Sequence, residues 1–242
     1  MVKEVRLSII DDFYEHFSQV YGDDERCFRG VSDSSHELIP SIGRILQLVD
    51  DEVMLSSYEL RIIDEFKRRV HPLLKYTPSS EWEWLFIAQH YGLPTRLLDW
   101  TSNPLVALYF AVTERPDKDF AIYTGMFLDR LYQNSNGQMQ ELGNIGDEPS
   151  DVIPYKLDKV CAVFPSFFDN RLQNQSAFFT AHPRPDKPLT SDVTKYIFPS
   201  HLKERFKEML DAFGINKTFL FPTIDVVAED IKTKWEMELP HM

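Results

Sequence analysis

The chain contains 242 residues, of which 43% are hydrophobic and 26% are charged. These are the proportions of a globular protein, so they exclude a largely disordered chain and a collagen-like repeat. Lysine and arginine number 26 against 38 aspartates and glutamates, which gives a formal net charge of −12. An acidic chain repels phosphate backbones at long range, so we expect no non-specific binding to nucleic acid.

Other sequence features indicate the cellular compartment of the protein and whether it holds a metal. The N-terminal segment turns acidic where a signal peptide would be apolar. The longest apolar run, residues 105–112, is far shorter than the ~20 residues of a membrane helix. Cys27 and Cys161 belong to no CxxC pair, which favours buried free thiols, and the histidines are scattered without metal-ligand spacing. The sequence therefore predicts a cytoplasmic protein with no membrane segment and no metal.

In chain order, helices and strands are predicted to mix without regular alternation. Helices are expected where apolar residues recur at three- to four-residue spacing or occupy every face, at 8–21, 52–75, 80–92, 103–114, 200–213 and 223–235. Strands are expected in short apolar runs at 26–31, 96–100, 120–124, 159–164, 176–180 and 193–198. Residues 133–150 contain few large apolar side chains and several turn formers, so we expect a long loop there.

This order of elements indicates an α+β fold. We expect a small, mostly antiparallel sheet, either continuous or split in two, with helices gathered at both chain ends. No stretch has the composition of a linker, so 1–242 is predicted to be one domain. The prediction places a helix within 1–25 and the core within 26–231.

An arginine stands inside the first predicted strand, in the sequence Phe28-Arg29-Gly30. A charged side chain in a short apolar strand is costly to bury unless it is paired. One interpretation is a buried bridge from Arg29 to a carboxylate. The other is an anion clamp, in which the guanidinium presents a fork to phosphate or carboxylate and Gly30 leaves room for a ligand.

A second polar cluster runs from His90 to Pro104, from a predicted helix end through a strand to a helix start. Polar groups at a strand end that faces a helix N-terminus form a natural anion site. Alternatively, the glycine and prolines are only turn residues, and Arg96 and Asp99 bridge each other. Each residue alone fits the structural interpretation, whereas the cluster as a whole favours function. Gln173 and Gln175, before another apolar strand, form a weaker third candidate.

Together these segments resemble the FRG domain family, which is named after its Phe-Arg-Gly motif. The second hallmark of that family, HYGxPTRLLDWTxxPxxALYFA, is nearly complete at residues 90–111. The third element, an arginine and a glutamine before an apolar strand, resembles Arg171 and Gln175. The closing LxxxGIxxxTLFP-type segment resembles residues 210–222.

The layout also resembles, distantly, the ADP-ribosyltransferase fold. Those enzymes carry an arginine on the first strand, where this chain has Arg29. Their Ser-Thr-Ser strand corresponds to Asp99-Trp100-Thr101, and their Glu-x-Glu motif to Gln173-Asn174-Gln175. The catalytic glutamate is thus a neutral glutamine here, and loss of such an electrostatic partner typically costs ~10²–10³ in rate. Asp99 is the best candidate to replace it.

The resemblance implies an enzyme that takes NAD or a related nucleotide into a cleft between the Arg29 strand and the Asp99 strand. The reaction would be ADP-ribose transfer, with a protein as one acceptor, or NAD hydrolysis, which would suit a toxin or a defence protein. The residues implied in binding the nucleotide are Arg29, Gly30, Tyr91, Arg96, Trp100 and Thr101. Asp99 would stabilise positive charge at the ribose, His90 would act as acid or base, and Gln175 would bind the ribose.

Two alternatives remain. The same arginine-lined cleft could belong to a non-catalytic module that binds a nucleotide or another anion, which the missing glutamate favours. Alternatively, Arg29 and Arg96 could bridge Asp99 or a nearby glutamate and hold the core without any ligand. The environment of Asp99 separates these alternatives, because a structural carboxylate is buried and a functional one faces an open pocket.

Overall fold

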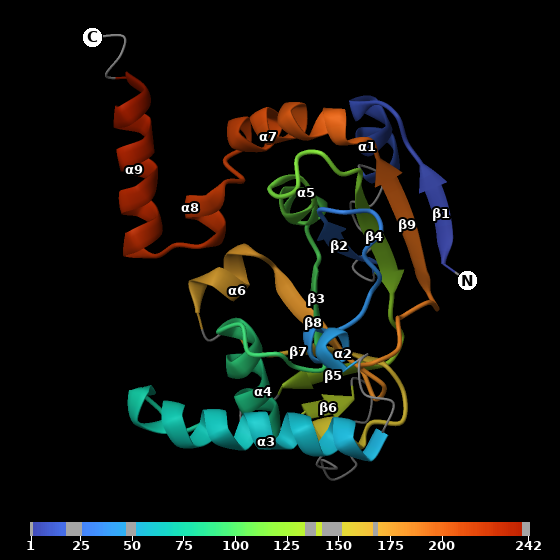
Figure 1. The fold of residues 1–242 in the computed structure, drawn as a ribbon, viewed down its shortest axis with the longest axis vertical. Coiled ribbons are helices and arrows are strands. Elements are labelled where there is room, and N and C mark those ends of the chain that lie inside the picture. Colours follow the sequence, from blue (N-terminus) through green and yellow to red (C-terminus); the bar gives the residue numbers. More distant parts are fainter. Residues whose placement is uncertain are drawn as a thin grey trace.

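Nine strands form one continuous sheet in the part of the chain that the computed structural model describes, namely residues 2–17, 26–46, 52–133, 139–141, 152–166 and 169–238 (Figure 1). The order across the sheet is β1-β9-β4-β2-β3-β8-β7-β5-β6. The strands are β1 (Lys3–Arg6), β2 (Arg26–Val31), β3 (Leu97–Thr101), β4 (Phe120–Met126), β5 (Arg130–Gln133), β6 (Met139–Glu141), β7 (Cys161–Phe164), β8 (Ala177–Ala181) and β9 (Val193–Phe198).

The helices gather around the two halves of this sheet. They are α1 (Ile10–Phe17), α2 (Ser41–Leu46), α3 (Glu52–Val70), α4 (Glu81–His90), α5 (Pro104–Val112), α6 (Asn170–Asn174), α7 (Lys203–Ala212), α8 (Lys217–Leu220) and α9 (Ile224–Glu238), with 3₁₀ turns at His71–Leu73, Pro154–Lys156 and Ser200–Leu202. Among the described residues, no helix combines the length and the apolar character needed to cross a lipid bilayer.

Local sequence explains where α4 and α5 begin. The Ser80 hydroxyl accepts a hydrogen bond from the Glu83 amide at 3.2 Å, as the capping-box pattern predicts. Asn103 caps α5 by accepting from the Leu105 amide at 2.9 Å, and Pro104 occupies the first turn. Helix α5 is largely buried, as expected from apolar side chains on every face.

The predicted α+β class and the mostly antiparallel sheet are confirmed. Only β1–β9 and β7–β5 pair in parallel among the described strands. The sheet is, however, larger than expected. Strand β1 was missed because it is a short edge strand with charged residues and no apolar alternation.

Two predicted segments need correction. Within 1–25, the helix covers only Ile10–Phe17, after strand β1, and residues 18–25 lie outside the described part. The loop expected at 133–150 contains strand β6, which pairs with the end of β5. The rest of that loop, 134–138 and 142–150, also lies outside the described residues.

The sheet nearly parts between β2 and β3. These strands share one residue pair, Phe28 with Thr101, whereas β2 pairs with β4 along its whole length. One core packs α1, α5 and α7 against the β2–β4–β9 half, and another packs α3 and α4 against the β3–β8–β7 half (Figure 1). The described strands thus form one continuous sheet rather than two, and its two halves are joined by a single residue pair where β2 and β3 diverge.

Helix α5 lies unusually close to β2. A Cβ atom added to Gly30 would stand 1.8 Å from the carbonyl oxygen of Ala107 and 2.8 Å from the Ala111 amide nitrogen. The glycine of the Phe-Arg-Gly motif is therefore required by the packing of a helix, and its expected role of leaving room for a ligand stays a prediction. Buried Lys203 ties the C-terminal end of α5 to α7, because its ammonium donates to the carbonyls of Glu114 and Arg115 at 2.7 and 2.6 Å.

We predict that Gly30→Ala lowers the free energy of unfolding by about 3 kcal/mol, at the upper end for overpacked cores, because backbone atoms must move. Gly125→Ala, on the neighbouring strand, is the control. Its added Cβ would meet the Phe127 ring at 3.0 Å, and a side chain can move aside. Urea unfolding of both variants tests this, and equal losses would contradict the explanation.

Candidate functional site

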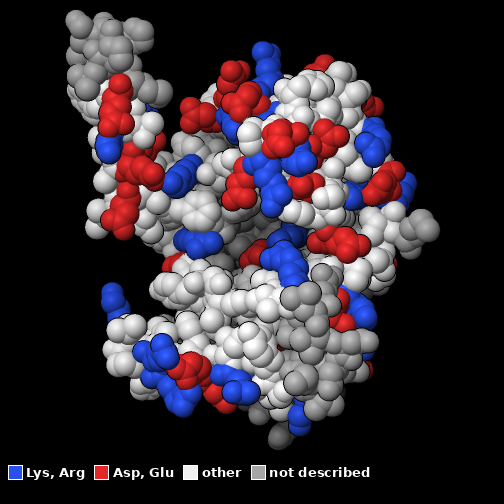
Figure 2. Space-filling model, viewed as in Figure 1, with Lys and Arg blue, Asp and Glu red and all other residues white. Residues whose placement is uncertain are grey.

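A cavity of about 390 Å³ opens where β2 and β3 diverge. Its walls come from β2, β3 and β8, from α4, α5 and α6, and from the segment that contains α2. Figure 2 shows a hollow in the middle of this face with basic and acidic groups at its rim. Its volume lies within the ~300–1,000 Å³ typical of small-molecule pockets. The place where β2 and β3 diverge therefore coincides with a pocket of ligand size.

Most of the predicted site residues meet in this pocket, although they come from separate segments. The predicted residues that line it are Arg29, Gly30, His90, Asp99, Trp100, Thr101 and Gln175. Arg96 and Tyr91 are not among the lining residues. The pocket also includes side chains that sequence reasoning did not select, among them Arg44, Gln89 and Phe110.

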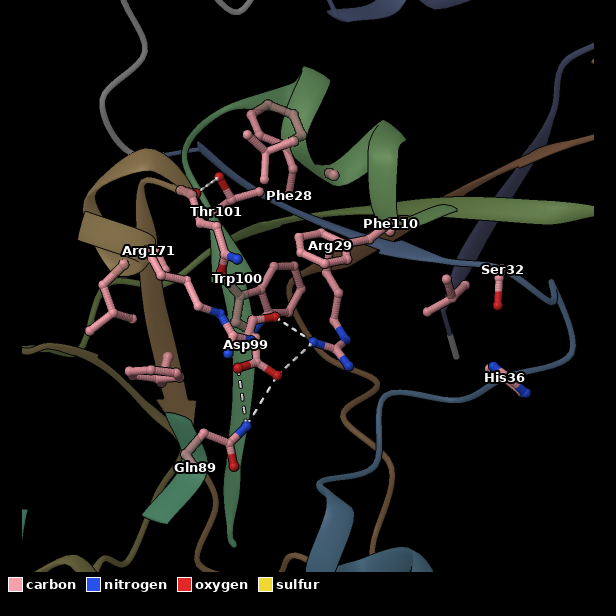
Figure 3. A pocket seen from close by; sticks show the side chains of 18 of the residues that line it. Phe28, Arg29, Ser32, His36, Gln89, Asp99, Trp100, Thr101, Phe110 and Arg171 are labelled. Atoms are coloured by element: carbon pink, nitrogen blue, oxygen red, sulfur yellow. Dashed lines mark hydrogen bonds and ion pairs between the residues drawn. The ribbon is translucent and has the colours of Figure 1, made fainter. Parts of the chain in front are cut away.

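Arg29 spans the gap between the diverging strands. The register of the single β2–β3 pair would bring Gly30 opposite Asp99, but instead Arg29 Nη1 donates to the Asp99 carbonyl oxygen at 2.7 Å. The same nitrogen lies 3.4 Å from Asp99 Oδ2 (Figure 3). Burial lowers the pKa of Arg29, Asp99 opposes this shift, and the nearby charge of Arg44 adds to it. No other described residue accepts a hydrogen bond from this guanidinium, so its remaining N–H groups are available.

Asp99 faces the open pocket and is held from the other side by Gln89. Its side chain is 55% exposed. Gln89 Nε2 donates to both carboxylate oxygens, at 3.0 and 3.1 Å (Figure 3). The Thr95 hydroxyl donates to Gln89 Oε1 at 2.5 Å, which fixes the end of the amide that faces Asp99. The Asp99 carboxylate is therefore exposed to the pocket and is not buried in a structural ion pair.

Arg96 has the opposite environment, and its predicted contact with a ligand is wrong. Its Nε and Nη2 donate to Glu59 Oε2 at 2.9 and 2.6 Å, and the two side chains are only 3% and 1% exposed. Its Nη1 donates to the Pro154 carbonyl at 3.2 Å. A charge this deeply buried must be paired. The suggested bridge from Arg96 to Asp99 is also wrong, because the partner comes from α3.

Neither aromatic residue predicted to stack on a ligand ring presents a free face to the pocket. Tyr91 is 70% exposed but lies outside the lining, with its ring edge-on to His90. Trp100 is 2% exposed, and its indole nitrogen donates to the Thr180 hydroxyl at 3.0 Å. Half-buried Phe110, on α5, is instead the lining aromatic that could contact a ring.

His90 connects α4 to α6. Its Nε2 lies 2.7 Å from Asp169 Oδ2, and Asp169 also caps α6 by accepting from the Leu172 amide at 2.9 Å. The pKa of His90 is lowered, chiefly by burial and additionally by the charge of Arg171, while the charge of Asp169 opposes this shift. The lowered pKa favours the neutral imidazole at pH 7, and one ring nitrogen is bonded to Asp169. This contact fits a positioning role for His90. An acid–base role stays a prediction.

Gln175 uses its side chain to hold the end of the chain rather than to face a ligand. Its Nε2 donates to the Leu220 carbonyl at 3.1 Å, and the residue is 8% exposed. Its own carbonyl accepts from the Thr101 hydroxyl at 2.7 Å. Asn174 similarly donates to the Phe219 carbonyl at 2.7 Å. The Gln-Asn-Gln segment therefore docks α8 and uses one of the two N–H groups of the Gln175 amide, and the predicted ribose contact of Gln175 stays a prediction.

The charges in the pocket are only partly paired. The lining contains the basic residues Arg29, Arg44 and Arg171 and the acidic residues Glu37, Asp99 and Glu114. Arg29 with Asp99 is the ion pair among them. Arg171 donates to the His90 carbonyl at 3.2 Å and lies over the Phe221 ring at 4.8 Å. Within the described ranges, no carboxylate neutralises Arg44 or Arg171, and no cluster of three or more metal-ligating side chains occurs. Among the described residues, the pocket therefore presents two arginines without a carboxylate partner, Arg44 and Arg171, beside two carboxylates without a basic partner, Glu37 and Glu114.

Comparison with known families agrees with the motifs. The family model of the FRG domain matches residues 24–120, which include Phe28-Arg29-Gly30 and the motif at 90–111. This match covers less than half of the chain and agrees with the resemblance that the motifs predicted. No curated protein and no solved structure matches the chain.

We predict that Gln175→Glu lowers the free energy of unfolding by ~1–3 kcal/mol, because a carboxylate would face the Leu220 carbonyl in place of a donor. If Gln175 were a weakened catalytic residue, the same change would instead restore activity without loss of stability. Gln173→Glu, two residues earlier and exposed, is the matched control and should change stability by less than ~0.5 kcal/mol. Chemical denaturation of both variants decides between these roles.

A second prediction concerns His182, which is buried with its Nε2 2.9 Å from the Thr180 hydroxyl. Burial and the charges of Arg29 and Arg96 lower its pKa to about 3. The unfolded chain, with a histidine pKa of ~6.5, takes up a proton that the folded chain does not. Stability should therefore fall as the pH drops below ~6.5, by up to ~1.4 kcal/mol per pH unit from this residue.

The measurement compares urea unfolding of the native chain and His182→Gln between about pH 6.5 and pH 4. The variant should lose stability less steeply, because it has no titrating group at this position. If the free energy of unfolding had the same pH dependence in both proteins, His182 would not be the group that lowers stability at acidic pH.

Proposed function

We propose that the pocket binds NAD or a closely related nucleotide and cleaves the bond between ribose and nicotinamide, passing ADP-ribose to water or to an acceptor group. The observation that carries this proposal is the half-exposed Asp99 carboxylate, which shares one pocket with the partly free guanidinium of Arg29. A carboxylate can stabilise developing positive charge, and an arginine can bind phosphate through charge-assisted hydrogen bonds.

The bond changes assign work to Asp99. The C1′–N bond breaks and its electron pair stays on the nitrogen of nicotinamide, which leaves as a neutral molecule. Water, or a nucleophilic atom of the acceptor, supplies the electron pair of the new bond to C1′ and releases a proton to solvent. Positive charge builds up on the ribose between these events, and the carboxylate would stabilise it. Gln89 holds this carboxylate in one orientation before any substrate arrives.

The resemblance to the ADP-ribosyltransferase fold supports this proposal. An arginine on one central strand, a neighbouring strand that diverges from it, and a helix of the PxxALxFA kind directly after that second strand follow the arrangement expected for such enzymes. This chain departs from those enzymes at Gln175, which stands where they have the catalytic glutamate. We assign the electrostatic role of that glutamate to Asp99. A cytoplasmic site of action is part of the proposal and is compatible with the free thiols of Cys27 and Cys161.

A non-catalytic binding module is the second candidate. Gln175 is committed to Leu220, and Arg29 already compensates part of the charge of Asp99. Both observations weaken the electrostatic stabilisation that the cleavage needs, while they leave the anion-binding groups intact.

We expect the native chain to release nicotinamide from NAD and Asp99→Asn to do so ~10²–10³-fold more slowly, because the amide carries no charge. Nicotinamide is quantified by chromatography, and the melting temperature is recorded with and without NAD. Asp117→Asn, an equally small change at an exposed site outside the pocket, is the matched control and should keep full activity.

The outcomes separate the two candidates. Stabilisation by NAD without nicotinamide release would establish the binding module and overturn the enzyme. Neither stabilisation nor release in the native chain would overturn both candidates. Release that is unaffected by Asp99→Asn would refute the role of this carboxylate.

A further inference from the structure

The short helix α2 is fixed rigidly beside the pocket. The Ser41 hydroxyl accepts from the Thr95 amide at 3.1 Å, and the Ile42 amide donates to the Thr95 carbonyl at 3.2 Å. Ile42 is fully buried. A Cβ atom on Gly43 would stand 1.7 Å from the Pro185 carbonyl oxygen, so the helix is packed against backbone on its other side. The backbone that carries the next residue, Arg44, is therefore held firmly in place.

Arg44 lines the pocket and has no charged partner among the residues that the structure describes. It is exposed and lines the same cavity as Arg29. Among the described residues it makes no hydrogen bond through its side chain and no ion pair. Glu37 and Glu114 also line the cavity, but neither lies within ion-pair distance of Arg44 or Arg29. Its charge acts on Arg29, whose pKa is lowered chiefly by burial and additionally by Arg44.

Two arginines that face one cavity repel each other unless an anion lies between them. Arg29 is held to Asp99 through Nη1 alone, which leaves Nε and Nη2 as donors. No group in the described ranges accepts a hydrogen bond from the guanidinium of Arg44, so its donors are available to a ligand. Together they offer more N–H groups than one arginine can present to a single phosphate, and phosphate oxygens accept such groups readily.

We infer that Arg44 and Arg29 form a phosphate-binding subsite of this pocket, with α2 as its rigid support. The inference rests on the proposed function in one respect, since it assigns the diphosphate of the nucleotide to this pair of arginines. Arg44 belongs to none of the motifs quoted above for the family, so the subsite would include a residue outside those motifs.

Isothermal titration calorimetry with two probes, ADP-ribose and inorganic pyrophosphate, tests the subsite. Arg44→Gln should weaken the binding of both probes by ~10–100-fold, the loss expected for charged hydrogen bonds. Arg44→Lys should recover only part of the affinity, because lysine keeps the charge but loses the planar fork. Arg61→Gln, an exposed arginine on α3 outside the pocket, is the matched control and should change the affinity less than twofold. Thermal melts verify that each variant is folded.

The result distinguishes this inference from the proposed function. If ADP-ribose binds the native chain and Arg44→Gln equally well, the subsite is wrong while nucleotide binding stands. If the native chain binds pyrophosphate but neither ADP-ribose nor NAD, and Arg44→Gln loses pyrophosphate, the anion subsite stands and the proposed function fails. If pyrophosphate and ADP-ribose both fail to bind the native chain, the subsite is overturned.

Discussion

The link between Arg29 and Asp99 is the interaction on which the site depends. Strands β2 and β3 are joined by one residue pair, and beyond it the ladder stops. A gap in a sheet exposes unpaired backbone groups, which are costly unless they find other partners. Arg29 satisfies the Asp99 carbonyl across that gap at 2.7 Å. The guanidinium thus allows the two halves of the sheet to separate and also places a charge at the opening that results.

The surroundings of this link are ordered by one buried residue, Thr95. Its hydroxyl orients Gln89, which holds the Asp99 carboxylate, and its backbone holds α2. Thr95 is fully buried, so neither contact is open to competition from water. A pocket whose polar groups are fixed before a ligand binds loses less entropy when the ligand arrives. The hydrogen bonds around Thr95 therefore connect the turn before β3 both to the Asp99 carboxylate and to α2.

Arg29 and Arg96 show that residue type alone does not decide function. Both are arginines at or beside central strands, and both were predicted to bind an anion. Arg96 meets Glu59 in a fully buried pair that also uses the Pro154 carbonyl, so it holds α3 against the sheet. Arg29 meets a carboxylate that is half exposed and keeps part of its donor capacity. The difference is the access of water to the partner carboxylate.

The local sequence by itself determined the fold class, most helix and strand positions, the caps of α4 and α5 and the segments that meet in the pocket. The fold class, the elements and the caps follow from the spacing of apolar residues and from side chains that act within a few positions, whereas the meeting of these segments in one pocket was implied by the family resemblance. Strand β1 escaped because a short charged edge strand carries no such pattern. Only the tertiary structure decided that Arg96 pairs with Glu59, that Gln175 holds Leu220, that Gly30 makes room for α5 and that Arg44 reaches the pocket. Each of these depends on a partner distant in sequence, and a single sequence does not say which distant groups meet.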